Sequence, residues 1–278
     1  MKLCGRDIGI DQPLFIIAGP DTLESQEMAI EVAGHIAEIA KKLDILYIFK
    51  GSFDKANRSS HESYRGPGLN EGLKMMEAIK KQIGVPVLTD VHEDTPLDEL
   101  KTVIDVIQTP AFLCRQTNFM QKVAMTGRPI NVKKGQFMSP WEMGNVIAKM
   151  KAVAADQFLL CERGFSFGYN NLVADMRGLA IMRKFSPVVF DATHTVQLPG
   201  GQGTASGGMR EMIPVLARAA VGAGVSGVFM ETHPRPDEAL CDGPNSLPLA
   251  KIQGLLETLV ALDKLVKSKP LLESELGA

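Results

Sequence analysis

Basic and hydroxyl side chains are densest in one stretch of the sequence, "FKGSFDKANRSSHESYRGPG", residues 49–68. It contains Lys50, Lys55, Arg58 and Arg65, interleaved with serine and asparagine side chains. Lysine offers a point charge and arginine a planar fork of donors, while the neutral side chains add single hydrogen bonds. This chemistry suits phosphate or carboxylate groups on a hydroxylated molecule. The alternative is a basic loop that faces only solvent.

Acidic and imidazole side chains follow apolar runs in three other places. Asp21 comes after Gly-Pro in "IIAGPDTLES", and His194 ends "FDATH". Glu231, His233 and Asp242 all lie in "FMETHPRPDEALCDGP". One imidazole and two carboxylates from such a stretch can form an open site for a divalent cation. A polar network around a substrate would use the same residues, and their spacing does not separate the two interpretations.

The segments that must position these residues alternate regularly between strand-like and helix-like patterns. Short β-rich runs predict eight strands, at 14–19, 45–50, 86–90, 106–108, 130–133, 158–163, 188–191 and 227–231. Apolar residues at the helical period predict helices between them, for example over 24–42 and 70–83, the second with Asn70 as N-cap and Gly84 as stop. Such alternation implies parallel strands with right-handed crossovers. Eight units favour an α/β fold of the (β/α)8 TIM-barrel type, with an open doubly wound sheet as the alternative.

The first residues, "MKLCGRDIGI", predict a short β-hairpin with its turn at Gly5, Arg6 and Asp7. Such an extension, over residues 1–12, could close the N-terminal end of the barrel. No linker, charge block or low-complexity tract divides the chain. We therefore expect a single domain over residues 1–278.

A barrel of this kind collects its active-site groups at the carboxyl ends of its strands. Polar or charged side chains follow all eight predicted strands: Asp21, Lys50, Asp90 with His92, Gln108, Lys133, Arg163, Asp191 with His194, and Glu231. Any one of them is explained by the polarity of loops, but the whole set favours one site. Several cations at one mouth imply substrates with several negative charges. The glycine-rich stretch at 198–208 is a candidate lid.

The overall composition excludes several classes of function. A net charge of −2 gives no reason to expect nucleic acid or an anionic membrane as partner. The four cysteines form no C-x-x-C pair, which argues against a disulfide framework and a zinc knuckle. The sequence shows neither a signal-peptide pattern nor a long apolar run. We expect a cytoplasmic protein that acts on small molecules.

Motifs in collinear order, from about residue 14 to about residue 265, resemble the 3-deoxy-D-manno-octulosonate 8-phosphate synthase (2-dehydro-3-deoxyphosphooctonate aldolase) family. They are "FKGSFDKANRSS", "TDVHE", "IQTPAFLCRQT", "NVKKGQF", "CERGFSFGYNNLV", "FDATH" and "ETHPRPDEALCDGP". The related 3-deoxy-D-arabino-heptulosonate 7-phosphate synthases share the barrel and the phosphoenolpyruvate site. They have K-P-R-T-S where this chain has "KANRSS" at 55–60, which favours the octulosonate family.

The resemblance implies an enzyme that condenses phosphoenolpyruvate with D-arabinose 5-phosphate and water. The products are 3-deoxy-D-manno-octulosonate 8-phosphate and phosphate, in lipopolysaccharide (Kdo) biosynthesis, and no organic cofactor is implied. Carried over by motif, the phosphoenolpyruvate ligands are Lys50, Lys55, Gln108, Lys133 and Arg163. The sugar-phosphate ligands are Asn57, Arg58 and Ser59, with Asp90 at the sugar end and Arg115 reaching a neighbouring subunit's sugar phosphate. The catalytic set is His194, Lys133, Asp242 and Glu231, and the oligomer is a homotetramer.

Two positions depart from the family pattern. After Arg58 the pattern reads S-S-I-H-S-[YF]-R-G, whereas here His61 stands one place earlier and Glu62 follows it. The role of His61 is therefore open. The second departure is the residue after Gly-Pro, where cysteine resembles the metal-dependent class of the family and asparagine the metal-independent class. This chain has Asp21 at that position.

Asp21 leaves metal dependence undecided. With His194, Glu231 and Asp242 it could bind a Mn-, Fe- or Mg-type cation. It could equally begin a D-x-x-E capping box with Glu24, which needs no metal. Two other functions also remain as alternatives: a heptulosonate synthase that uses erythrose 4-phosphate, and a non-catalytic barrel that binds sugar phosphates without turnover.

Overall fold

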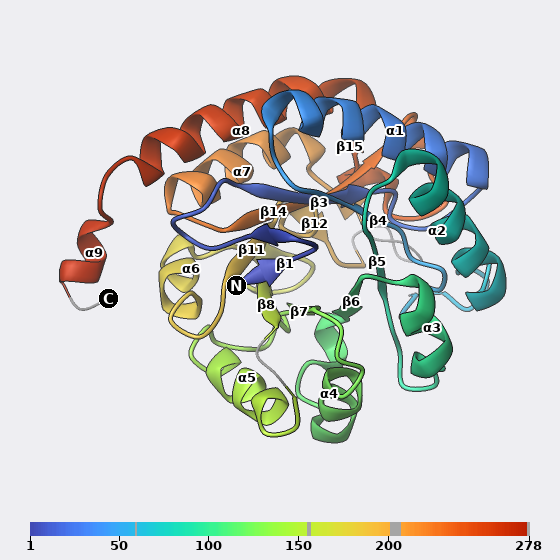
Figure 1. The fold of residues 1–278 in the computed structure, drawn as a ribbon, viewed down its shortest axis with the longest axis horizontal. Coiled ribbons are helices and arrows are strands. Elements are labelled where there is room, and N and C mark those ends of the chain that lie inside the picture. The colour runs from blue at the N-terminus through green and yellow to red at the C-terminus, as the bar shows by residue number, and fades with distance from the viewer. Residues whose placement is uncertain (59, 155–156, 201–206, 277–278) are drawn as a thin grey trace.

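The computed structural model describes residues 1–58, 60–154, 157–200 and 207–276, and its centre is a closed ring of parallel strands (Figure 1). The strands of the ring are β3 (Phe15–Gly19), β4 (Tyr47–Lys50), β5 (Val87–Asp90), β6 (Val106–Thr109), β7 (Ile130–Lys133), β8 (Phe158–Glu162), β11 (Val188–Asp191) and β14 (Gly227–His233). Neighbours in sequence are neighbours in the ring, and the last strand, β14, closes it by pairing in parallel with the first, β3. This confirms the TIM barrel and excludes the open sheet, which would leave two free edges.

Helices surround the barrel on its outside (Figure 1). They are α1 (Gln26–Leu43), α2 (Leu69–Ile83), α3 (Leu97–Val103), α4 (Thr117–Ala124), α5 (Met143–Lys151), α6 (Met176–Met182), α7 (Ile213–Gly222), α8 (Ile252–Lys267) and the C-terminal α9 (Leu272–Glu275). Short strands complete the described fold: β9 (Phe165–Ser166), β10 (Leu172–Val173), β12 (Gln197–Leu198), β13 (Gly207–Gly208) and β15 (Leu247–Pro248). No helix among the described residues has the length and apolar character needed to cross a bilayer.

Helix α1 begins two residues later than its apolar period suggests. Its N-cap is Ser25, whose hydroxyl accepts a hydrogen bond from the Met28 amide at 3.1 Å. The predicted capping box of Asp21 with Glu24 is therefore wrong, because a serine closer to the helix satisfies the free amide. The Asp21 carboxylate is thus left for other contacts.

The predicted N-cap of helix α2 is wrong as well. Gly68 occupies that position with a φ of 82°, and Asn70 lies in the first turn of the helix. The positive φ turns the incoming loop into the helix, a backbone conformation that glycine adopts more easily than asparagine. The predicted stop at Gly84 is confirmed, with a φ of 77°.

The N-terminal segment forms the predicted antiparallel hairpin, of β1 (Lys2–Leu3) and β2 (Arg6–Asp7). Its turn lies one residue earlier than predicted, at Cys4 and Gly5, which both have positive φ, 47° and 83°. A two-residue hairpin turn of this kind needs that conformation at both positions. Leu3 and Ile8 are buried in one apolar cluster with the side chains inside the barrel. The hairpin thus closes the N-terminal end, and the carboxyl ends of the strands are left for a site.

Alternation along each strand separates the two sides of the barrel wall. In β3, Phe15 and Ile17 point into the barrel, whereas Ile16 and Ala18 pack against the surrounding helices. Both layers are apolar and buried, so the strands hold a fixed spacing and angle. The polar residues at the strand ends therefore project from a rigid frame.

Candidate active site

A cavity of about 200 Å³ opens at the carboxyl end of the barrel. The predicted site residues on its wall are Asp21, Lys55, Asn57, Arg58, Asp90, Gln108, Lys133, Arg163, His194, Glu231 and Asp242. Residues from distant parts of the chain are thus brought to one place by the ring of strands. Their individual roles in binding and catalysis remain predictions.

Lys50, Arg115 and His61 were also singled out in the sequence, but they do not line this cavity. Lys50 is fully buried and contacts carboxylates that do line the cavity. Ser59 lies outside the described residues, as do residues 201–206 of the candidate lid. Arg115 is exposed, with its guanidinium 3.9 Å from Glu142, and its contact with a neighbouring subunit stays a prediction. His61 is exposed.

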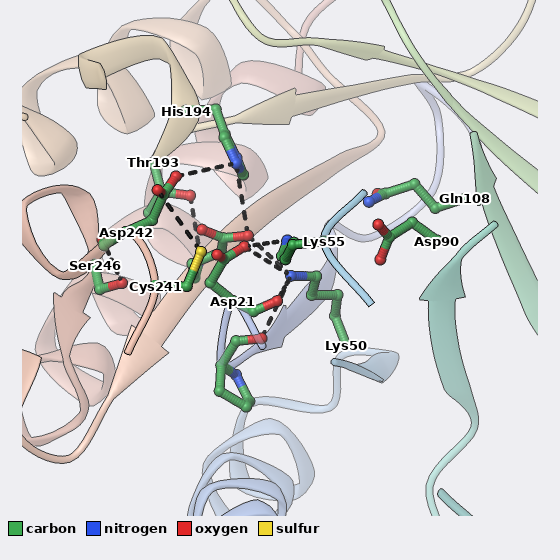
Figure 2. A network of polar contacts seen from close by, with 12 residues as sticks. Asp21, Lys50, Lys55, Asp90, Gln108, Thr193, His194, Cys241, Asp242 and Ser246 are labelled. Carbon is green, nitrogen blue, oxygen red and sulfur yellow. Dashed lines mark hydrogen bonds and ion pairs between the residues drawn. The ribbon is translucent and has the colours of Figure 1, made fainter. Parts of the chain in front are cut away.

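Asp21 and Glu231 are two buried carboxylates linked by Lys50. Figure 2 shows Asp21 beside Lys50 and Lys55. Lys50 Nζ donates to Glu231 Oε1 at 2.9 Å, to Asp21 Oδ1 at 3.3 Å and to the Asp21 carbonyl at 2.6 Å. The Lys55 ammonium also pairs with Asp21 Oδ1. Asp21 Oδ2 and Glu231 Oε2 are buried and have no hydrogen-bond partner among the described residues. Each carboxylate therefore uses one oxygen for a lysine and leaves the other for a further partner.

The electrostatics of the two carboxylates differ. Burial opposes the ionisation of Asp21, but the charges of Lys55 and Lys50 outweigh it and hold the pKa of Asp21 well below its usual range. Burial and the charge of Asp21 raise the pKa of Glu231 to about 7. At neutral pH Asp21 is thus ionised, while Glu231 is close to the midpoint of its titration.

The raised pKa of Glu231 predicts a pH-dependent stability of the metal-free protein. The folded protein keeps this proton to a higher pH than the unfolded chain, so the stabilisation is complete at low pH and is lost as the pH rises through about 7. Between the ordinary carboxyl pKa of 4.5 and about 7, we expect the free energy of unfolding to fall with rising pH. The slope is at most about 1.4 kcal/mol per pH unit, the limit for one titrating group. Glu231→Gln should remove this contribution, as measured by denaturant unfolding in the presence of a chelator.

Glu257→Gln, at an exposed position on α8, serves as the matched control and should keep the wild-type slope of stability against pH. An identical slope in the wild type and Glu231→Gln would contradict the assignment of this titration.

Asp191, at the end of β11, fixes both His194 and Lys133. Its Oδ1 accepts hydrogen bonds from the Thr193 amide at 3.1 Å, the Thr193 hydroxyl at 3.0 Å and the His194 amide at 2.8 Å. Its Oδ2 lies 2.8 Å from His194 Nδ1 and also pairs with the Lys133 ammonium. Burial opposes the ionisation of Asp191, but His194 and Lys133 hold its pKa well below the usual range. His194 Nε2 is thereby directed toward Glu231 and Asp242, at 3.7 and 3.8 Å from their oxygens.

His233 does not take part in this cluster. Its Nδ1 accepts a hydrogen bond from the Arg235 amide at 3.0 Å, and its Nε2 lies 3.6 Å from Glu24 Oε1. The interpretation that combined His233 with Glu231 and Asp242 in one metal site is therefore wrong. The imidazole comes instead from His194 at the end of the neighbouring strand.

The residues present fit a divalent cation. Ligand atoms of Asp21, His194 and Glu231 all lie within 4.8 Å of one another, and so do those of Asp21, Cys241 and Asp242. Oxygen and imidazole donors are typical of such cations, and the unpartnered oxygens of Asp21 and Glu231 supply free coordination capacity.

Cations on the cavity wall have donors that no described residue satisfies. Arg163 Nη2 donates to Gln197 Oε1 at 3.1 Å, but its Nη1 is buried without a partner, as is Arg58 Nε. The Lys133 ammonium lies over the Phe229 ring, 3.3 Å from its centroid. Burial lowers the pKa of Arg163 in spite of nearby acidic groups. Because unpaired buried donors are costly, this arrangement is typical of a site for an anion.

Gln197 and Cys241 line the cavity but were not predicted as site residues. Gln197 links the acidic cluster to the cations of the cavity wall. Its Nε2 donates to Asp242 Oδ2 at 2.8 Å, and its Oε1 accepts from Arg163. Its position three residues after His194 was the available signal. Cys241 lines the cavity beside Asp242, yet the cysteine count assessed it only for disulfides and zinc knuckles.

Comparison with known proteins gives one consistent result. The DAHP synthetase I family matches the chain over residues 5–268. A protein of Alkalilimnicola ehrlichii named 2-dehydro-3-deoxyphosphooctonate aldolase is 63% identical over 277 residues, which cover 99% of this chain and 100% of the relative. Proteins with the same name are 63% identical over 272 residues in Methylococcus capsulatus (98% and 96% covered) and 64% identical over 268 residues in Legionella pneumophila (96% and 98% covered).

Proposed function

The chain belongs to the DAHP synthetase I family, and on this premise we propose that it catalyses the reaction of the 2-dehydro-3-deoxyphosphooctonate aldolases that it matches along nearly its full length. Phosphoenolpyruvate, D-arabinose 5-phosphate and water give 3-deoxy-D-manno-octulosonate 8-phosphate and inorganic phosphate. The reaction supplies lipopolysaccharide (Kdo) biosynthesis and takes place in the cytoplasm.

The observation that carries this proposal is the set of cations on one cavity wall. Lys55, Arg58, Lys133 and Arg163 all face the cavity, and buried N–H groups of both arginines have no partner among the described residues. Phosphoenolpyruvate carries a phosphate and a carboxylate, and the sugar carries a second phosphate. Such ligands satisfy the free donors and neutralise the buried charge.

The substrates are assigned to two regions of the cavity. Phosphoenolpyruvate is held by Lys55, Gln108, Lys133 and Arg163, and Lys50 acts from beneath through Asp21 and Glu231. Arabinose 5-phosphate is held by Asn57, Arg58, Ser59 and Asp90. Asp90 and Gln108, one from each region, are register partners on the neighbouring strands β5 and β6.

The condensation forms one carbon–carbon bond and breaks one carbon–oxygen bond. Carbon 3 of phosphoenolpyruvate attacks the sugar aldehyde, whose oxygen takes a proton, and water adds at carbon 2. The bond from carbon 2 to the phosphate oxygen then breaks, which leaves a ketone and inorganic phosphate. Negative charge develops on the aldehyde oxygen and the leaving phosphate, where Lys133 and Arg163 supply positioned donors.

In the absence of a bound cation, His194 and Glu231 are suited to proton transfer in this sequence. His194 is held at Nδ1 by Asp191, so that Nε2 faces the cavity beside Asp242. A carboxyl with a pKa of about 7, as in Glu231, can accept and return a proton at neutral pH. A divalent cation would be held by Asp21, His194, Glu231 and Asp242, and when bound it would polarise an oxygen of the reacting groups.

We propose that the functional unit is a homotetramer. Aromatic side chains are exposed in the loops after β6, β7 and β8: Phe112, Phe137, Trp141, Phe167 and Tyr169. Exposed apolar surface of this kind marks contacts with other proteins. Arg115 lies in the first of these loops, consistent with its contact with the sugar phosphate of another subunit.

Arg58→Ala should raise the KM for arabinose 5-phosphate by roughly 10–100-fold, because it removes charge-assisted hydrogen bonds to the phosphate. The KM for phosphoenolpyruvate should change far less. Arg6→Ala removes an arginine of the N-terminal hairpin and should leave both constants unchanged. An unaltered KM for the sugar phosphate in Arg58→Ala would remove Arg58 from this role.

The reaction itself is tested by incubating the protein with phosphoenolpyruvate and arabinose 5-phosphate. We expect one phosphate released for each molecule of the eight-carbon acid phosphate detected by mass spectrometry. Repeating the assay with a chelator, and then with added Mn²⁺ or Zn²⁺, determines whether the reaction needs the cation. Stabilisation by both ligands without phosphate release would instead support a non-catalytic sugar-phosphate barrel.

A further inference from the structure

Cys241 is a buried thiol among charged groups at the cavity, and the proposed condensation does not use it. It lies in the loop after β14, and its Sγ is 3.9 Å from Asp242 Oδ1. Ligand atoms of Asp21, Cys241 and Asp242 lie within 4.8 Å of one another. A buried cysteine usually serves as a small apolar side chain, but the neighbours of Cys241 are carboxylates and the Arg58 guanidinium.

The loop backbone is shaped to present two successive side chains to the same cavity. Asp242 has a φ of 50°, in the left-handed region that residues other than glycine rarely adopt. Cys241 and Asp242 both line the cavity as a result. Such backbone strain persists where the surrounding structure enforces it, and it often accompanies a functional site.

Asp21 is the common member of the two donor groups. Its side chain is 2% exposed, and its Oδ2 has no partner among the described residues, because both lysines contact Oδ1. In Figure 2, Cys241 and Asp242 lie on one side of Asp21 while Lys50 and Lys55 lie on the other. The free oxygen thus has thiol, carboxylate and imidazole groups near it, and each of these groups can coordinate a divalent cation.

We infer that Cys241 is a ligand of the divalent cation, together with Asp21, Asp242 and His194. This ligand is added to the metal site of the proposed function, and the inference rests on that proposal only for the presence of a divalent cation. A thiolate is a soft ligand, so its presence favours Fe²⁺, Co²⁺ or Zn²⁺ over Mg²⁺. The thiol thus makes the site selective for transition metals, which the carboxylates alone would not do.

Cobalt is the probe for this ligand, because a bond from thiolate to Co²⁺ gives an intense charge-transfer absorption in the near ultraviolet. The full-length protein is stripped with a chelator and titrated with Co²⁺ alone, without substrates. We expect one Co²⁺ per chain and a charge-transfer band that Cys241→Ser and Cys241→Ala abolish. Cys4→Ser, in the hairpin at the other end of the barrel, should keep the band.

A second measurement uses Zn²⁺ and Mg²⁺ affinities from competition titrations. Removing a residue that only supports a metal ligand already lowers metal affinity by about 10–100-fold. Cys241→Ser removes a ligand itself, so Zn²⁺ binding should weaken by about 100-fold or more. Mg²⁺ binding should hardly change. Far-ultraviolet circular dichroism of each variant verifies that it is folded.

Three results would overturn the inference. They are Co²⁺ binding to the wild type without a charge-transfer band, a band that persists in Cys241→Ser, and no Co²⁺ binding at all. None of them depends on turnover, so each is distinguishable from a failure of the condensation assay.

Discussion

Lys133→Ala should lower kcat by roughly 10²–10³-fold, the loss expected when one positioned donor to a developing negative charge is removed. Lys133 lies at the end of β7, is buried, and projects over the Phe229 ring into the cavity. Steady-state phosphate release at saturating substrate measures the effect.

Loss of fold must be separated from loss of catalysis in this variant. Lys133 compensates the buried Asp191, so its removal also lowers stability, and thermal unfolding must show a folded protein at the assay temperature. Lys122→Ala, at an exposed position on α4, is the matched control and should retain the wild-type kcat. A near-normal rate in folded Lys133→Ala would remove Lys133 from the active site.

Asp191→Asn should be the second severe change, with kcat reduced by roughly 10²-fold or more. The amide keeps the shape of the carboxylate but loses its charge, so that it no longer compensates Lys133 or orients His194 through Nδ1. Breaking a buried pair on one side also costs about 3–5 kcal/mol of unfolding free energy. Both kcat and denaturant unfolding are therefore measured.

Asp98→Asn, at a solvent-exposed carboxylate on α3, controls for loss of a negative charge and should change neither quantity. Wild-type kcat in Asp191→Asn would show that His194 and Lys133 do not need this carboxylate for turnover.

The barrel could be predicted from the sequence because its signals are local. Apolar runs at the strand spacing and helical periods between them predicted the eight strands to within about two residues at each end. Helix starts were less accurate, since Asp21, Ser25 and Asn70 are all chemically capable caps. The conformation of the loop before each helix determines which of these residues caps the free amides of the first turn.

The site was harder to predict because its contacts join distant strand ends. Polar residues at the strand ends located Lys133, Arg163, His194 and Glu231, whereas the separate interpretation that placed His233 in a metal site was wrong. His233 is closer in sequence to Glu231, yet the β14 backbone directs it away. Cys241 was assessed only for disulfides and zinc knuckles, because the sequence does not show the left-handed turn at Asp242 beside which it reaches the cavity.

Asp21 has a clearer place in the molecule than its sequence context indicated. It is not a helix cap, and it joins the lysines to the donors around Asp242. The lysines contact Oδ1, and Oδ2 has no partner among the described residues, so the proposed cation and the lysine ammonium groups would share this carboxylate. We expect metal selectivity at the proposed site to depend on the neighbouring donors, Cys241 among them.

The central claim is that this chain condenses phosphoenolpyruvate with arabinose 5-phosphate. Its most direct test compares kcat/KM for phosphate release with arabinose 5-phosphate and with erythrose 4-phosphate, at a fixed concentration of phosphoenolpyruvate. We expect a preference for arabinose 5-phosphate of at least about tenfold, the discrimination that a few substrate contacts provide. A preference for erythrose 4-phosphate, or no phosphate release with either sugar, would contradict it.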